Sequence, residues 1–129
     1  MKLLVDTHCW LWLQAQPERF SDPLRLRLED PETEVLLSAA SAWEIAIKYA
    51  LGKLPLPAPP HEYVPSRMQI SATTPLPVVH AHALRVAALP AHHRDPFDRL
   101  IVAQAQLESL PVLTADPQLR AYEIETLSP

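Results

Sequence analysis

The sequence is short of glycine and cysteine. Its 129 residues include one glycine, Gly52, and one cysteine, Cys9. With a single cysteine no internal disulfide can form, which agrees with a reducing compartment, and we expect a cytoplasmic protein. With a single glycine there is no glycine-rich loop to hold phosphates. These absences exclude a disulfide-stabilised scaffold and a glycine-rich phosphate-binding site.

Long apolar runs and an excess of basic residues are also missing. No run approaches the roughly 20 apolar residues of a membrane helix, and we expect no membrane association. The N-terminal stretch MKLLVDTHCW has no small-residue cleavage site and is not expected to be a signal peptide. The chain has 11 Lys and Arg against 15 Asp and Glu, a net charge of -4. Binding to nucleic acid would therefore need local basic groups or bound cations.

Prolines are abundant, with 15 in the chain, and the hydrophobic share of 48% fits a single globular domain. Short apolar runs predict strands at 3–5, 35–38 and 111–116, with weaker candidates at 75–79 and 123–127. Between them we predict helices at 8–15, from Ser21 to Pro31, and at 41–51, 61–71 (with Pro65 as a potential break), 81–89 and 96–108. This alternation predicts an α/β fold, a three-layer α/β/α sandwich with a mainly parallel central sheet of four or five strands.

The helix after the second strand has the clearest amphipathic pattern. Ser41 and Glu44 have the spacing of a capping box, and Glu44 and Lys48 that of an i, i+4 ion pair. Gly52 stands where a left-handed C-terminal cap is expected. We therefore predict a helix that begins at Ser41. Its apolar residues recur at helical spacing on one face: Trp43, Ala46, Ile47, Ala50 and Leu51.

Four acidic residues stand at strand ends or in first helical turns: Asp6, Glu44, Asp98 and Asp116. Asp6 follows the first strand, where it or Thr7 could cap the next helix. Asp95 and Asp116 each precede a proline, which is the pattern of a helix N-cap. Asp98 is favoured by the helix dipole. Each acid therefore has a structural explanation when it is taken alone.

Taken together, the four acids predict a metal site. Ligands bind parallel α/β sheets in the crevice beyond the carboxyl ends of the strands. Asp6, Glu44 and Asp116 follow strands, and Asp98 joins them because a crossover helix begins at that edge. Converging carboxylates repel one another, and a divalent cation with oxygen ligands relieves the repulsion. A ligand set without histidine or cysteine favours Mg²⁺ or Mn²⁺ over zinc.

The sequence resembles the PIN domain family, and within it the VapC-type toxin ribonucleases of type II toxin–antitoxin systems. The similarity lies in four stretches that follow the family order: LLVDTHCWLW, LSAASAWEIAIKYALGKLPLP, HHRDPFDRLIVAQAQ and LPVLTAD. They cover nearly the whole chain, and although each is weak alone, together they are specific. The resemblance implies a single PIN domain over residues 1–129 and a metal-dependent endoribonuclease that uses Mg²⁺ or Mn²⁺.

The resemblance also assigns residues. The acid set of the family falls on Asp6, Glu44, Asp98 and Asp116, with Asp95 as a further candidate because it belongs to the HRDPFD signature of one subgroup. Hydroxyl residues beside the acids would orient carboxylates or a metal-bound water: Thr7, Ser38 and Thr114. We expect contacts to RNA phosphates from the nearest basic residues: Arg94, Arg99 and Lys48. The alternative is that Lys48 only pairs with Glu44 and that both arginines are solvated.

The implied partners are an RNA substrate, a cognate antitoxin protein and a second copy of the chain in a homodimer. One function of a different class stays open, a catalytically silent PIN-like module that acts by protein binding. A zinc interpretation would use histidines and the cysteine, but no zinc-binding spacing supports it: His8, Cys9, His80, His82, His92 and His93. Trp10 and Trp12 are expected in the core or in a dimer interface.

Overall fold

The short apolar segments form a parallel sheet at the centre of the protein. The computed structural model describes residues 1–129 and contains five strands: β1 (Lys2–Val5), β2 (Glu34–Ser38), β3 (Thr74–Leu76), β4 (Val112–Leu113) and β5 (Thr126–Leu127). Their order in the sheet is β3-β2-β1-β4-β5, and every neighbouring pair is parallel. The predicted α/β fold with a parallel sheet is therefore confirmed.

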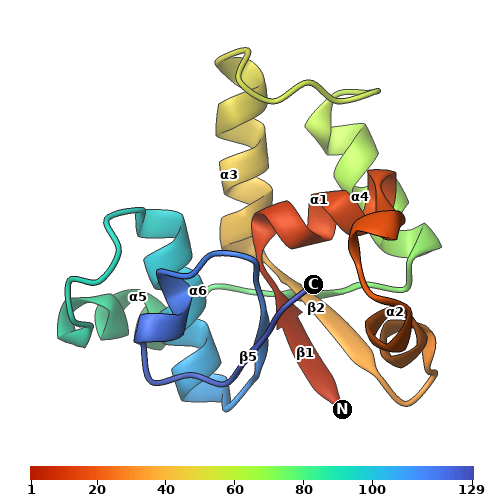
Figure 1. The fold of residues 1–129 in the computed structure, drawn as a ribbon. Coiled ribbons are helices and arrows are strands. Elements are labelled where there is room, and N and C mark those ends of the chain that lie inside the picture. The colour runs from red at the N-terminus through yellow and green to blue at the C-terminus, as the bar shows by residue number, and fades with distance from the viewer.

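Six α-helices surround the sheet (Figure 1): α1 (Thr7–Ala15), α2 (Asp22–Glu29), α3 (Ala39–Ala50), α4 (Pro60–Ile70), α5 (His80–Arg85) and α6 (Pro96–Glu108). The bounds of α6 are those predicted, because Asp95 and Pro96 mark its start unambiguously. Short 3-10 turns lie between α1 and α2, after α5 and after β4, at Pro17–Arg19, Val86–Ala88 and Leu119–Ala121. None of the helices is both long enough and apolar enough to cross a membrane.

Both faces of the sheet are buried, which explains the continuous apolar runs of its strands. Successive residues of a strand point to opposite faces. Leu3 and Val5 lie in the same apolar cluster as Trp10, while Leu4 lies with Ile101 on the side of α6. Trp10 is fully buried, so it belongs to the core.

The strand order creates one point where the chain reverses its direction across the sheet. From β1 the chain moves outward through β2 to β3, and it later returns to the other side of β1 as β4 and β5. Loops on the two sides of such a point diverge and leave a crevice at the carboxyl ends of the strands. Asp6 follows β1 directly, and Asp116 follows β4. The topology therefore places these two acids on either side of the crevice.

The start of α3 differs from the prediction. The Ala40 N–H donates to the Ser38 side-chain oxygen over 3.0 Å, and the helix begins at Ala39. The predicted start at Ser41 and its capping box with Glu44 are therefore wrong. Because the helix begins earlier, Glu44 lies in the second turn and is buried.

The apolar residues of α3 also face the other way from what their spacing suggests. Trp43 is 60% exposed and Leu51 is 63% exposed, whereas Glu44 and Ile45 are buried. Figure 1 shows α3 extending beyond the end of the sheet, so most of the helix has no strand to pack against. Gly52 follows with a φ of 71°, the left-handed conformation predicted for it.

Smaller differences concern proline-rich segments. Pro65 lies inside α4 without ending it. The edge strand β3 covers Thr74–Leu76 rather than 75–79, and an edge position tolerates Pro75 because its missing N–H is not needed there. The predicted helix 81–89 is a short α5 that begins at His80, followed by a 3-10 turn.

Candidate metal centre

Asp6 is held at the end of β1 by its own backbone and side chain. Its N–H donates to the Leu113 carbonyl over 3.0 Å, which ties the end of β1 to β4. Its Oδ1 accepts the Cys9 N–H at 2.8 Å, so Asp6, and not Thr7, caps α1. The second carboxylate oxygen is not used by the cap. Asp6 therefore combines a structural role with a carboxylate at the crevice.

Glu44 projects from α3 into the interior. Its Oε2 accepts a hydrogen bond from Lys48 one turn later, which is the predicted i, i+4 pair. Its Oε1 is buried and has no hydrogen-bond partner. A buried carboxylate oxygen without a partner is costly, because desolvation is not repaid. Such an oxygen is suited to a cation.

Asp95 and Asp98 have different roles at the start of α6. Asp95 Oδ1 accepts the N–H groups of Phe97 at 2.8 Å and Asp98 at 3.3 Å, so Asp95 is the helix cap. The Asp98 side chain is thereby left to point away from the helix. The structure thus assigns the cap to the first aspartate and leaves the second for the crevice.

Asp116 comes from the loop after β4. The Asp116 N–H donates to Thr114 Oγ1 at 3.0 Å, and Asp116 Oδ1 accepts the Gln118 N–H at 2.9 Å. Thr114 also forms a side-chain hydrogen bond to Asp6, so one hydroxyl connects both acids. The predicted orienting role therefore has a geometric basis for Thr114. Ser38 instead caps α3, and the buried Thr7 hydroxyl donates to Ser41 Oγ at 2.9 Å.

A histidine that the sequence analysis did not place at the acids lies between two of them. His93 Nε2 is 2.9 Å from Asp116 Oδ2 and 3.1 Å from Asp98 Oδ2. These three side chains are the one group of three or more potential metal ligands in the structure. The sequence carried a weak signal, because His93 stands two residues before the cap Asp95. Zinc-binding spacing gives no information about a histidine two residues before a helix cap.

Burial and mutual repulsion dominate the electrostatics of the cluster. Burial, and then the charges of Asp95 and Glu44, raise the pKa of Asp98 to about 7, although His93 opposes the shift. Burial also raises the pKa of Asp6, against hydrogen bonds from Thr114 and Cys9. A divalent cation fits this arrangement, since it would relieve the repulsion and give Glu44 Oε1 a partner.

Lys48 is the positive group that pairs with Glu44. Partial burial alone would lower the pKa of Lys48, but the hydrogen bond to Glu44 and the charges of Glu44, Asp95 and Asp98 hold it above its ordinary value. Lys48 is therefore positively charged and bound to Glu44 in this cluster. The pairing with Glu44 does not by itself exclude a phosphate contact.

Arg94, in the loop before α6, and Arg99, in the first turns of α6, differ in their contacts. Arg94 is exposed and has no assigned partner. Arg99 donates to the Tyr122 hydroxyl and to several backbone carbonyls: Val86, Leu89, Pro90 and His93. Because its guanidinium nitrogens are used in this way, Arg99 organises the loop that carries His93. The expected phosphate contact is therefore not supported for Arg99.

Arg99→Lys should destabilise the protein by about 2 kcal/mol, because an ammonium group cannot reproduce the planar set of hydrogen bonds. Urea denaturation measures the change, and Arg94→Lys, at an exposed position of the loop before α6, is the matched control. Equal stability of the two variants would contradict the assigned role of Arg99.

The other histidines and the cysteine do not come together in a group of potential metal ligands. His82 is buried and pairs with Glu108 at 2.8 Å between Nε2 and Oε1, far from the acids in the fold, on the α5–α6 side. Burial raises the pKa of the Cys9 thiol, so a thiolate is disfavoured there. The structure therefore gives no support to a nucleophilic cysteine.

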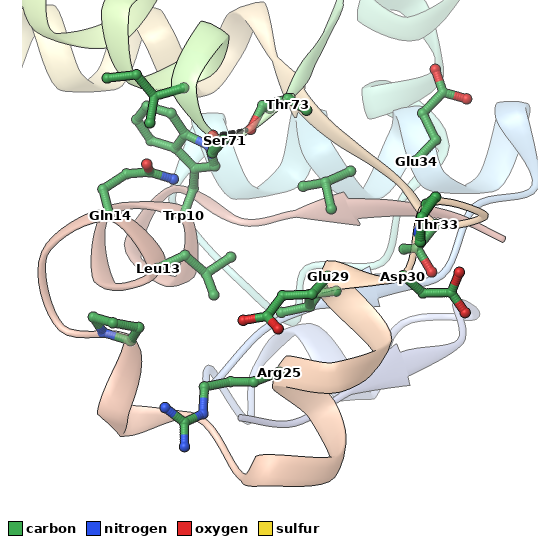
Figure 2. Close-up of a pocket in the computed structure, with 16 residues that line it drawn as sticks. Trp10, Leu13, Gln14, Arg25, Glu29, Asp30, Thr33, Glu34, Ser71 and Thr73 are labelled. Atoms are coloured by element: carbon green, nitrogen blue, oxygen red, sulfur yellow. Dashed lines mark hydrogen bonds between the residues drawn. The ribbon is translucent and has the colours of Figure 1, made fainter.

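A cavity of about 600 Å³ lies apart from the acids (Figure 2). It is lined by residues of α1, α2 and the start of β2, and Asp6, Glu44, Asp98 and Asp116 are not among them. In Figure 2 the Trp10 indole points toward Thr73, to which its N–H donates over 3.2 Å. The candidate metal centre is thus separate from this cavity.

Comparison with known proteins identifies the fold family. The sequence signature of the PIN domain matches residues 3–125. A stretch of 58 residues is 59% identical to Ribonuclease VapC16 of Mycobacterium tuberculosis, and it spans 45% of this chain and 41% of that protein. The chain thus matches less than half of the length of this relative.

Solved structures agree with the fold. DNA-bound VapBC from Salmonella typhimurium aligns with a TM-score of 0.73 at 18% identity, over 99% of this chain and 98% of that one. VapBC2 from Rickettsia felis, bound to a DNA fragment from its promoter, aligns with a TM-score of 0.71 at 14% identity and the same coverage, 99% and 98%. The chain belongs to the PIN domain family, and part of it is similar to a VapC ribonuclease.

Proposed function

We propose that this chain is a metal-dependent endoribonuclease and the toxin of a toxin–antitoxin pair. Its substrate is RNA, and its metal is Mg²⁺ or Mn²⁺. The observation that supports the proposal is the close approach of Asp98 and Asp116, with the charges of Glu44 and Asp6 acting on Asp98 and with the buried, partnerless Glu44 Oε1. Structural neighbours that are toxin–antitoxin complexes support the partner.

In this proposal the chain's residues divide the work by their place in the crevice. Asp6, Glu44, Asp98 and Asp116 hold the cation, which supplies an activated water and stabilises charge on the scissile phosphate and the leaving 3′-oxygen. Thr114 orients Asp6 and Asp116 through its hydroxyl. Exposed Arg94 contacts the RNA backbone, and Lys48 balances the charge of Glu44.

A cognate antitoxin and a second copy of the chain are the proposed protein partners. The outward apolar residues of α3, Trp43 and Leu51 in particular, support a protein contact, because large exposed apolar groups commonly mark interaction sites. The same observation favours the alternative function, a catalytically silent binding module. The ribonuclease requires the metal-binding acids for its activity, whereas the silent binding module does not.

Expression of the chain without an antitoxin should arrest bacterial growth, and Asp6→Asn should relieve the arrest. Asp22→Asn, at an exposed aspartate that only pairs with Arg25, is the matched control and should stay toxic. Sequencing of RNA 5′ ends after brief induction would reveal the cleavage sites. Equal toxicity of Asp6→Asn and the wild type would favour the silent binding module.

A further inference from the structure

His93 is fixed in one tautomer by its surroundings. The Asp95 N–H donates to His93 Nδ1 over 3.1 Å. A ring nitrogen that accepts a hydrogen bond carries no proton, so the proton of the neutral imidazole is on Nε2. A metal-binding histidine shows the reverse pattern, in which the second ring nitrogen donates to a carbonyl or carboxylate. His93 is therefore a hydrogen-bond donor to Asp116, and the same Nε2 lies 3.1 Å from Asp98 Oδ2.

The backbone of His93 is anchored by parts of the chain outside its own loop. The His93 N–H donates to the Tyr122 hydroxyl over 2.9 Å, and the His93 carbonyl accepts from Arg99 Nη1 at 3.3 Å. The neighbouring His92 ring packs edge-on against Tyr122, with centroids 5.0 Å apart. The side chain of His93 is 12% exposed. The donor is thus held in place independently of the acids.

The two acids need such a donor when no cation is bound. Asp98 Oδ2 and Asp116 Oδ2 both lie within about 3 Å of the same nitrogen, so their carboxylates crowd one another. Burial and the nearby charges of Asp95 and Glu44 raise the pKa of Asp98, so a second negative charge is unfavourable at this place. His93 therefore partly offsets the repulsion that a divalent cation would remove.

We propose that His93 is a positioning residue that stands in for the cation: its Nε2–H holds Asp98 and Asp116 together in the metal-free protein and releases them when the cation binds. This inference rests on the proposed metal site. Since His93 stabilises the metal-free state and is not needed in the loaded state, it weakens metal binding. Its removal has to tighten binding, by thermodynamic linkage.

The test compares His93→Leu, His93→Gln and His92→Leu. Isothermal titration with Mg²⁺ and with Mn²⁺ should show binding to His93→Leu that is tighter than to the wild type by about tenfold or more, the worth of a lost hydrogen bond to a charged group. In EDTA the melting temperature of His93→Leu should be lower than that of the wild type. Added metal should raise the melting temperature of His93→Leu by more than it raises that of the wild type. His93→Gln, which keeps an N–H donor, should lie between, and His92→Leu should bind metal like the wild type.

Each other result overturns a specific statement. Weaker metal binding by His93→Leu would make His93 a ligand, and unchanged binding would make it merely structural; both contradict the inference while leaving the metal site intact. No metal binding by the wild type would overturn the proposed function and the inference with it. If His93→Leu fails to fold, ¹⁵N spectra of the wild-type imidazoles decide, because a proton on Nδ1 of His93 in the metal-free protein contradicts the assignment.

Discussion

Asp98→Asn is expected to lower the rate of RNA cleavage by about 100-fold or more, since replacement of residues that merely support metal ligands already costs 10- to 100-fold. Asp98 is the aspartate of α6 left free by the cap, and its carboxylate lies beside Asp116 and within the charge fields of Glu44 and Asp6. An amide at this position keeps the shape but removes the charge that attracts the cation. Cleavage of a labelled RNA in Mg²⁺ or Mn²⁺ measures the effect.

The same variant should lose most of the metal-induced rise in melting temperature. A ligand that binds only the folded state stabilises it in proportion to its affinity, and millimolar Mg²⁺ or Mn²⁺ should therefore raise the melting temperature of the wild type. Asp22→Asn serves again as the control, because its exposed side chain lies outside the cluster. An undiminished shift in Asp98→Asn would show that the acids do not form the metal site.

The stability of the metal-free protein should depend on pH through Asp98. In the unfolded chain this group titrates near 3.8, and in the fold its pKa is raised to about 7, first of all by burial. Between these values the folded state holds a proton that the unfolded state has lost. The contribution of Asp98 to stability is therefore complete at low pH, declines as the pH rises, and is lost above about pH 7.

Comparison with Asp98→Asn isolates this contribution from other titrating groups. In EDTA the advantage of the variant over the wild type in free energy of unfolding should grow by about 2 to 3 kcal/mol between about pH 5 and about pH 8. Urea denaturation at both pH values gives the difference. Mg²⁺ should reverse the order at the higher pH, because only the wild type can bind it there. A difference independent of pH would contradict the raised pKa.

The sequence alone was sufficient for the sheet and for α6. Continuous apolar runs such as 3–5 and 35–38 are buried on both faces, and this is typical of parallel strands. Asp95 and Pro96 begin α6 because aspartate caps a helix and proline suits its first turn, both of which are local effects. Asp98 follows as the free acid from the same local geometry.

The sequence was not sufficient for α3. The sequence pattern predicted the cap at Ser41, whereas in the structure the Ser38 side chain accepts the Ala40 N–H and the helix begins at Ala39. That start turns Glu44 inward and Trp43 outward, against the apolar pattern of the helix. A buried acid in place of a buried tryptophan is unfavourable for packing alone, which marks this end of the helix as a site.

His93 shows most clearly what depended on tertiary structure. Residue spacing could place Asp6, Glu44, Asp98 and Asp116 near one edge, because strand ends and helix starts are properties of chain order and topology. Spacing could not reveal that the His93 ring lies between Asp98 and Asp116, which are brought together from α6 and from the loop after β4. The chain order thus determined which acids could meet, whereas the packing of Arg99 and Tyr122 against the loop decided which donor meets them. The reason is that a hydrogen bond between distant segments depends on where side chains of both lie, and no local pattern carries that information.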